Sequence, residues 1–367
     1  MALINLDLED VKKNLNRAVD QELPLIYELR EQIKNLKIQE LGYRQCYAIA
    51  PVATDGGENN ISFEPINLEI IRVVDSEGIV HFQDFIPLSS DPSIFKEMFE
   101  EIAVLSNFFK ELDLTYDEIS YFLPSTKDIK KYAKGIEREK IDNRDYIRII
   151  RDIAEWAVLL NLASNPGKTR VLLLRDGLLR TKILNLQTVD KMRDRFERAY
   201  RENGTLIVGV AKRSKVLSYL SLGLTLEKTF ELQSPCFCEV PEEIEKRCYK
   251  WERTWMGKQF GKMHLVKLAE GKGGIVLPVD IPVWLLERRK EVLEYLAETA
   301  KSSFPIVGYP HPLIKAHENA VLHGLEISVL SDLMVKRITE DKVDEDIERI
   351  FRHVNLGKGL IKGGIRE

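Results

Sequence analysis

The chain has 367 residues, of which 44% are hydrophobic and 31% are charged. This balance is typical of a folded globular protein and excludes an intrinsically disordered chain. No apolar run approaches the roughly 20 residues that a membrane helix needs, and the first residues, MALINLDLEDVKK, lack the pattern of a secretory signal. Four cysteines do not make a disulfide scaffold. We therefore expect a soluble, cytoplasmic protein that does not associate with a membrane.

Positive and negative charges nearly cancel. The chain has 54 Lys and Arg residues against 58 Asp and Glu residues, which gives a net charge of −4. This excludes a uniformly basic nucleic-acid coat, so any binding of DNA or RNA would use local patches. An enzyme whose active site is acidic because it holds a metal ion fits this charge.

The N-terminal part predicts a helical segment followed by three strands. Apolar residues recur at helical spacing over residues 1–42, and Pro24 is expected to break or kink the helix. The segment YRQCYAIAPVAT predicts a buried strand that stops at Asp55-Gly56-Gly57. INLEIIRVVD and GIVHFQDFIPL follow, separated by a turn at 76–78. Together the three strands predict an antiparallel meander.

The remaining sequence alternates helices with buried strands. Apolar periodicity predicts helices in SIFKEMFEEIAVLSNFFKEL, DYIRIIRDIAEWAVLLNLA and VDKMRDRFERAYREN. TRVLLLRDG and TLIVGVAK predict central strands, and KMHLVKLAE with GGIVLPVDI predicts a hairpin. VWLLERRKEVLEYLAETAKS and PLIKAHENAVLHGLEISVLSDLM predict closing helices. The order indicates a mixed α/β sheet with its first and fourth strands in the centre.

Two aspartates stand where such a sheet binds ligands. Asp55 and Asp176 each follow an apolar strand and each precede a glycine. Ligands of open α/β sheets bind at the carboxyl ends of strands, and the glycine lets the backbone turn away from the acid. If the strands are neighbours, both carboxylates reach one divalent ion. The simpler interpretation is that each Asp-Gly pair is only a turn.

A third acid lies in an otherwise apolar helix. Glu155 is the only polar residue in the run AEWAVLL, and a buried carboxylate needs either a partner or a metal ion. A two-metal site stabilises both the attacking and the leaving oxygen of a phosphodiester. The alternative is a buried salt bridge with Arg148 or Arg151. The three acids in this order are more specific than any one of them.

Two weaker patterns concern metal and nucleotide binding. Cysteines and a histidine in the second half have irregular spacing, which is not typical of a zinc ribbon. These residues are Cys236, Cys238, Cys248 and His264. NPGKT lacks the first glycine of a P-loop, which excludes an ATP site of that type.

Local basic and aromatic residues are candidates for DNA binding. Lys212 and Lys215 follow a buried strand and would neutralise phosphates, unless they only begin a solvated helix. The segment KRCYKWERTWMGKQFGK places Trp251 and Trp255 among basic residues. This mixture suits stacking on single-stranded bases, although aromatic side chains in a helix are often part of the core.

Five segments, in this order, resemble the NurA nuclease family: ATDGG, the mid-chain acidic helix, VLLLRDGLL, LIVGVAKRSK and GYPHPLIKAHENAVL. The resemblance extends over residues 43–330. It implies a ribonuclease H-like mixed sheet with flanking helices and an N-terminal helical segment. On this basis we expect a helical segment at 1–42, a NurA-like nuclease domain at 43–330, and a C-terminal helix with a flexible tail at 331–367.

The resemblance also implies an activity, a cofactor and partners. The activity is that of a Mn²⁺- or Mg²⁺-dependent nuclease on single- and double-stranded DNA, with 5′–3′ exonuclease and single-strand endonuclease activity. The implied partners are a second copy of the chain and a HerA-type hexameric ATPase, which act together in DNA end resection and repair. By motif, Asp55, Glu155 and Asp176 match the metal-binding acids of the family, and His317 matches the histidine of its C-terminal helix.

Some family positions stay open or differ. Glu118 is an alternative to Glu155 as the helical acid, and the functional tyrosine of the family has two candidates, Tyr219 and Tyr249. The usual serine after the first Asp-Gly is Gly57 here, and Arg175 stands before the second aspartate, where apolar residues are common. The leading hypothesis is a metal-dependent DNA nuclease. The alternative is a catalytically weak, nuclease-like DNA-binding adaptor for an ATPase motor, which would need no cluster of metal-binding acids.

Overall fold

Nine strands form one mixed sheet in the computed structural model, counted within the residues that the structure describes. These are residues 8–45, 49–63, 66–87, 93–119, 143–165, 167, 170–181, 183–184, 186–249, 260–271 and 273–339. The strand order is β1-β7-β8-β9-β6-β5-β2-β3-β4. The strands are β1 (Gln39–Glu40), β2 (Ile49–Phe63), β3 (Ile66–Asp75), β4 (Val80–Pro87), β5 (Arg170–Asp176), β6 (Leu206–Val210), β7 (Cys236–Glu239), β8 (Gly261–Lys267) and β9 (Val276–Pro282).

Helices cover both faces of this sheet. They are α1 (Leu8–Lys34), α2 (Ser93–Glu101), α3 (Ala103–Leu112), α4 (Tyr116–Ile119), α6 (Asn143–Ser164), α7 (Leu186–Asn203), α8 (Lys215–Leu226), α9 (Glu242–Cys248), the 3₁₀ helix η2 (Val283–Arg288), α10 (Arg289–Ala300), α11 (His311–Ala320) and α12 (Gly324–Thr339). Among the described residues, no helix is long and apolar enough to cross a membrane.

The strand order confirms the expected ribonuclease H-like sheet. Strands β2, β3 and β4 form the predicted antiparallel meander, and β2, β5 and β6 are parallel. The resulting order β4-β3-β2-β5-β6 has β3 as its one antiparallel member, which is the ribonuclease H arrangement. The first and fourth strands, β2 and β5, which are expected in the centre, lie inside the sheet and pair with each other. However, β6 is the middle strand of the nine, because the sheet continues through the antiparallel strands β9, β8, β7 and β1.

Strand β2 does not stop at Asp55-Gly56-Gly57 as the sequence predicted. It continues to Phe63, and its residues from Thr54 onward pair with β3, including Asp55 with Val74 and Gly57 with Arg72. The two glycines are therefore inside a long hairpin arm rather than in a turn. The local sequence indicates a stop, whereas cross-strand hydrogen bonding keeps the backbone extended.

Several helix boundaries also differ from the predictions. The helix α1 runs without a break through Pro24, which is exposed, so water can satisfy the carbonyl group that the proline leaves unpaired. The helix predicted over 93–112 is divided, because Ile102 is extended between α2 and α3. The C-terminal helix is likewise divided into α11 and α12. The predicted boundary at residue 330 lies inside α12.

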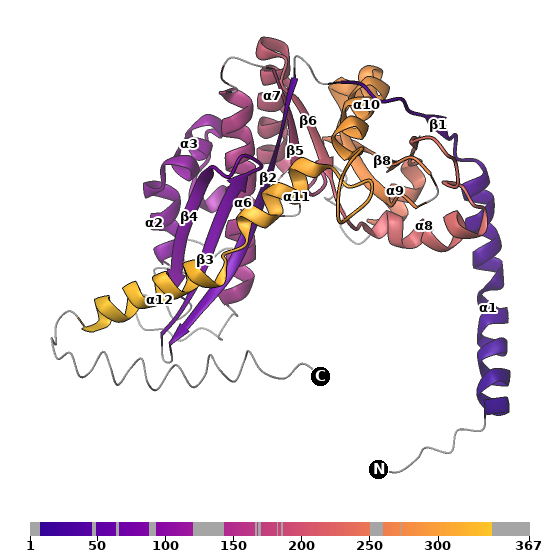
Figure 1. Cartoon of the computed structure of the whole chain (residues 1–367), viewed down its shortest axis with the longest axis horizontal. Coiled ribbons are helices and arrows are strands. Elements are labelled where there is room, and N and C mark those ends of the chain that lie inside the picture. The colour runs from indigo at the N-terminus through magenta and orange to yellow at the C-terminus, as the bar shows by residue number, and fades with distance from the viewer. Residues whose placement is uncertain are drawn as a thin grey trace.

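The core has two layers, one on each face of the sheet. On one face, α2, α3, α6 and α7 pack on β2 to β6, and α1, α8 and α9 pack on the β7–β8 side. On the other face lie α10 and α11. Figure 1 shows α11 and α12 running across β2 and β3, while α1 projects away from the body of the molecule. Each face of β2 is thus covered by one helix, α6 or α11, near the residues that carry chemistry.

Candidate metal centre

Asp55 and Asp176 lie side by side on neighbouring parallel strands. Strand β2 pairs with β5 in a register that places Thr54 opposite Arg175, so the two aspartates follow at the same level. Strand β5 ends at Asp176, while β2 continues. Because side chains alternate along a strand, both acids point to the face covered by α11, which we call the α11 face. The opposite face is the α6 face.

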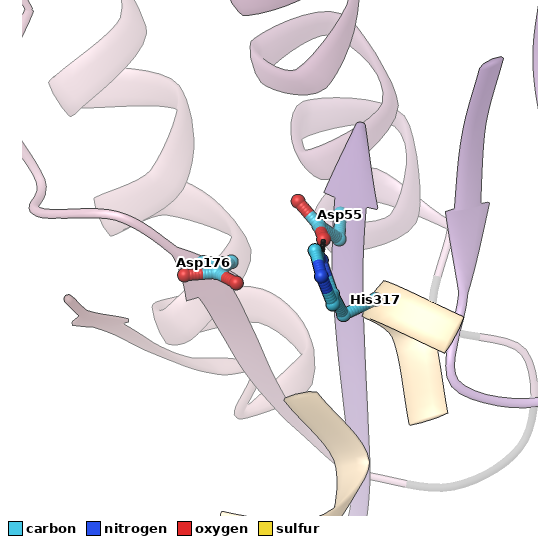
Figure 2. A group of neighbouring side chains, drawn as sticks. All are labelled: Asp55, Asp176 and His317. Carbon is cyan, nitrogen blue, oxygen red and sulfur yellow. Dashed lines mark hydrogen bonds and ion pairs between the residues drawn. The ribbon is translucent and has the colours of Figure 1, made fainter. Parts of the chain in front are cut away.

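His317 completes a group of three converging side chains. Its Nδ1 atom lies 2.7 Å from Oδ2 of Asp55. One donor atom from each of Asp55, Asp176 and His317 lies within 4.8 Å of the others, as Figure 2 shows for the side chains that carry them. Within the described residues, this is the one group of at least three His, Cys, Asp or Glu side chains with that spacing. Two carboxylates and an imidazole are a suitable donor set for Mn²⁺.

Gly57 explains how a helix can lie so close to the strand. A Cβ atom added at Gly57 would overlap the carbonyl oxygen of Ala320, the last residue of α11. Any larger residue would therefore push α11, and with it His317, away from Asp55. Gly57, where the NurA resemblance implies a serine, thus lets the backbone of α11 lie directly against β2.

The environment of Asp55 shifts the pKa of its carboxyl group upward. Burial raises the pKa of Asp55, and the neighbouring Asp176 raises it further. The contact with His317 and a hydrogen bond from the Gly56 N–H to Oδ1 of Asp55 oppose that shift. A cation at this position would compensate for both the lost solvation and the repulsion between the acids. The side chain of His317 is 57% exposed, so solvent reaches its ring.

Both oxygens of Asp176 have partners. The hydroxyl group of Tyr309 donates a hydrogen bond to Oδ1 at 3.2 Å, and Nζ of Lys212 lies 3.1 Å from Oδ2. The ammonium group also lies 5.2 Å from the centre of the Tyr309 ring. Burial and the nearby Asp176 raise the pKa of Tyr309, so the phenol stays protonated and acts as a donor. Lys212, a predicted candidate for phosphate binding, thus lies next to Asp176.

On the α6 face, Glu155 approaches β2 through a gap left by Gly56. A Cβ atom at Gly56 would lie 2.5 Å from Oε1 of Glu155. Gly56 therefore allows close packing rather than a turn, contrary to the role predicted for it. Glu155 is buried, which raises the pKa of its carboxyl group, while Arg175 opposes that shift. Its oxygens do not belong to the group formed by Asp55, Asp176 and His317.

Two arginines hold Glu155. Nη2 of Arg175 lies 3.3 Å from its Oε2 atom, and Nε of Arg151 lies 3.6 Å from its Oε1 atom. The salt bridge with Arg151 that the sequence left open is therefore confirmed. Arg148 instead pairs with Glu58.

Arg175 has further contacts on the α6 face. It donates to Oδ1 of Asp152 at 2.6 Å and to the carbonyl oxygen of Leu178 at 3.0 Å, and its guanidinium carbon lies 4.3 Å from the centre of the Trp156 ring. The turn predicted at Gly177, after Asp176, is confirmed. Gly177 has a φ of +143°, and a Cβ atom there would overlap the guanidinium group of Arg175.

The remaining predicted residues are Lys215, Trp251, Trp255 and Glu118. Lys215 begins α8, where the hydroxyl group of Ser214 caps the helix by accepting a hydrogen bond from the Leu217 N–H. Trp251 and Trp255 lie outside the described residues. Glu118 is in α4, but its side chain is outside the described part of the chain. The predictions for Trp251, Trp255 and Glu118 therefore lie outside what the structure describes.

Tyr309 was missed by sequence reasoning. Of the two predicted tyrosines, Tyr219 contacts Gln32 of α1, and Tyr249 lies under the guanidinium of Arg180. Tyr309 instead donates to Asp176, as described above. Its signal was its position in GYPHPLIKAHENAVL, eight residues before His317, at the entry to α11.

The cysteine set does not form a metal site in the described residues. Burial raises the pKa of Cys236 to about 11 and that of Cys238 to about 12, so both are neutral thiols near pH 7. The ring of His264 lies against Phe237, 5.9 Å between ring centres. Cys236, Cys238 and His264 are buried and contribute to the core.

Comparison with known proteins finds a family match for part of the chain. Residues 98–234 match the family model of the NurA domain. The matched segment includes Glu155, Asp176 and Lys212, while Asp55 and His317 lie outside it. No curated protein matches the chain.

The chain is also similar to solved structures. The NurA nuclease from Sulfolobus solfataricus is 14% identical, with 93% of this chain and 99% of that chain covered and a TM-score of 0.47. A NurA structure with bound dAMP and manganese is 9% identical, with 94% and 99% covered and a TM-score of 0.40. Endonuclease V from Bacillus subtilis is 12% identical, with 86% and 92% covered and a TM-score of 0.26.

Proposed function

We propose that this chain is a divalent-metal-dependent nuclease that hydrolyses phosphodiester bonds of DNA. The observation that carries the proposal is the convergence of Asp55, Asp176 and His317 within 4.8 Å, in a chain whose residues 98–234 match the family model of the NurA domain. These donors fit Mn²⁺ or Mg²⁺, because the carboxylates are hard oxygen ligands and imidazole suits Mn²⁺ as well. A bound ion would polarise the phosphate and lower the pKa of a coordinated water.

The surrounding side chains have complementary roles. Asp55 and Asp176 would hold the ion, and Tyr309 orients the Asp176 carboxylate through Oδ1. His317 is held at Nδ1 by Asp55, so its other ring nitrogen is available to exchange a proton with the attacking water or the leaving 3′-oxygen. Lys212 lies beside the acids and would neutralise a phosphate oxygen of the substrate.

The finer features of the proposal follow from the NurA resemblance. They are 5′–3′ exonuclease and single-strand endonuclease activity, a role in DNA end resection and repair, a homodimer, and association with a HerA-type hexameric ATPase. The helix α1 is a suitable partner surface because Val11, Leu15 and Val19 are exposed along it. Trp251, Trp255 and Lys215 remain candidate DNA contacts, and the cytoplasm remains the expected location.

A cleavage assay tests the proposal. The purified chain is incubated with end-labelled single- and double-stranded DNA over a range of Mn²⁺ and Mg²⁺ concentrations, with and without a HerA-type ATPase. We expect cleavage that requires the metal and is abolished by EDTA. DNA binding without metal-dependent cleavage, in the presence and absence of the ATPase, would instead favour the adaptor function. Light scattering at micromolar concentration tests the dimer.

A further inference from the structure

The structure separates the acids into a group that is open to a cation and a group already occupied by protein cations. We propose that this chain binds one divalent ion, at Asp55 and Asp176 beside His317, and that Arg175 and Arg151 take the position beside Glu155 that a second ion would need. This inference rests on the proposed function and specifies it further. Arg175 is then a positioning residue, since it acts through Glu155 rather than on the substrate.

The first support is that both oxygens of Glu155 face a guanidinium group. Arg175 lies at Oε2 and Arg151 at Oε1, at 3.3 and 3.6 Å. A second ion bound by Glu155 would lie beside two permanent positive charges in a buried region, where repulsion between like charges is only weakly screened. The carboxylate would have to leave both arginines to act as a metal ligand.

The second support is that Arg175 is fixed independently of Glu155. Its shortest contact is with Asp152, at 2.6 Å, and it also donates to the Leu178 carbonyl group and stacks on the buried Trp156. The side chain of Arg175 is 7% exposed, and Gly177 has no Cβ atom where its guanidinium lies. The loop after β5 is thus shaped around this arginine. A change at Glu155 alone would not remove the guanidinium from the site.

The third support is that N–H donors in this region lack a hydrogen-bond acceptor. Among the described residues, the buried Nε atom of Arg175 has no hydrogen-bond partner, and the Nε atom of Arg151 lies beyond hydrogen-bond distance, at 3.6 Å, from Glu155. A region with unused N–H donors needs a further acceptor, such as a phosphate oxygen or water, rather than a further cation.

A metal titration of the full chain tests the inference without an activity readout. Mn²⁺ is titrated and bound ions are counted by isothermal titration calorimetry and by loss of the free Mn²⁺ electron paramagnetic resonance signal. We expect one ion per chain in the wild type. We also expect one ion in Glu155→Gln, with a Kd within about threefold of the wild type, and none in Asp55→Asn or Asp176→Asn. Two ions in the wild type, with one lost in Glu155→Gln, would overturn the inference.

The role of Arg175 has its own variant. Arg175→Met restores the apolar type that is common in the family and frees Glu155, so we expect a second Mn²⁺ that is lost again when Glu155→Gln is added. If a folded Arg175→Met variant still binds only one Mn²⁺ ion, Arg175 is not the residue that excludes a second ion. Arg193→Met, on the exposed side of α7, is the matched control, and circular dichroism checks the fold. If Arg175→Met does not fold, the wild-type and Glu155→Gln counts still decide the stoichiometry.

The outcomes distinguish this inference from the proposed function. A wild-type chain that binds no Mn²⁺ and cleaves no DNA would contradict the nuclease proposal itself. A chain that cleaves DNA with two bound ions would contradict only the single-ion inference.

Discussion

On the α11 face of the β2–β5 strand pair, the acids lie beside groups that can move away. Asp55 contacts a histidine whose side chain is 57% exposed, and Asp176 contacts Lys212, whose side chain is 41% exposed. On the α6 face, Glu155 lies beside Arg175, which is almost fully buried and has three further contacts. Acids of the same chemical type therefore occupy different electrostatic environments on the two faces.

The difference follows from which protein cations are present and how firmly they are held. Breaking the ion pair between an exposed lysine and a carboxylate costs little free energy, because surface ion pairs contribute only about 0–1 kcal/mol to stability. Removing one partner from a buried pair instead costs about 3–5 kcal/mol, because it leaves an uncompensated charge. A cation from solution can thus replace Lys212 far more easily than Arg175. Four predictions test this contrast.

The largest effect is expected on the α11 face. Asp55→Asn and Asp176→Asn should each lower metal-dependent cleavage by at least about 10³-fold, because loss of a ligand removes several kcal/mol of stabilisation from the transition state. Single-turnover cleavage in Mn²⁺ measures this, with Asp194→Asn on exposed α7 as the control. Activity of both variants within tenfold of the wild type would exclude this site.

His317 is expected to have the next largest effect. His317→Ala should reduce turnover by about 10²–10⁴-fold if the ring transfers a proton, with DNA binding nearly unchanged. If the ring is instead a metal ligand, excess Mn²⁺ should partly restore the rate. The measurement is cleavage rate against Mn²⁺ concentration, together with thermal unfolding.

His311→Ala, on the exposed first residue of the same helix, is the matched control for His317→Ala. A purely structural role for His317 would lower the melting temperature while activity per folded molecule was preserved. That result would remove His317 from the site.

A pH-dependent stability test sharpens the contrast on the α6 face. The folded-state pKa of Glu155 is raised above its ordinary value of 4.5, so the unfolded chain releases this proton first as the pH rises. The wild type therefore loses stability from this group as the pH rises from about 4.5 through the raised pKa. Glu155→Gln lacks this loss. Between pH 5 and pH 9, its free energy of unfolding should therefore increase relative to that of the wild type by an amount on the order of 1 kcal/mol, and its melting temperature should rise accordingly.

Calorimetric melting of both proteins over that pH range provides the measurement. Glu243→Gln, on the exposed side of α9, is the control and should show no such trend. A difference between Glu155→Gln and the wild type that shrinks with rising pH would mean that Arg175 outweighs burial at Glu155.

The smallest effect is expected at Lys212. Lys212→Met should weaken binding of single-stranded DNA in a similar way for all sequences and reduce the slope of log K against log salt by about 1, because one phosphate contact is lost. Stability should change by less than about 1 kcal/mol. Binding titrations at several salt concentrations measure the slope, with Lys110→Met on α3 as the control. An unchanged slope would exclude Lys212 as a phosphate contact.

Much of the fold was predictable from local patterns. The meander, the central strands and the order of helices follow from apolar periodicity and turn residues, which are properties of short segments. The predictions that were wrong concern places where a distant partner decides the conformation. Strand β2 passes through two glycines because β3 pairs with it, and α1 continues through Pro24 because that part of the helix is exposed to water.

The site shows the same division. The sequence by itself determined the kinds of residue present: two aspartates after apolar strands, a glutamate in an apolar helix, and a helical histidine. Only the tertiary structure decided that Asp55 and Asp176 share a face with His317 and Tyr309, and that Glu155 lies on the other face with Arg175. The physical reason is that side chains alternate along a strand, so residues that are adjacent in sequence point to opposite faces of the sheet. The helices that cover those faces come from segments more than 100 residues apart, and their contacts are fixed by packing rather than by local sequence.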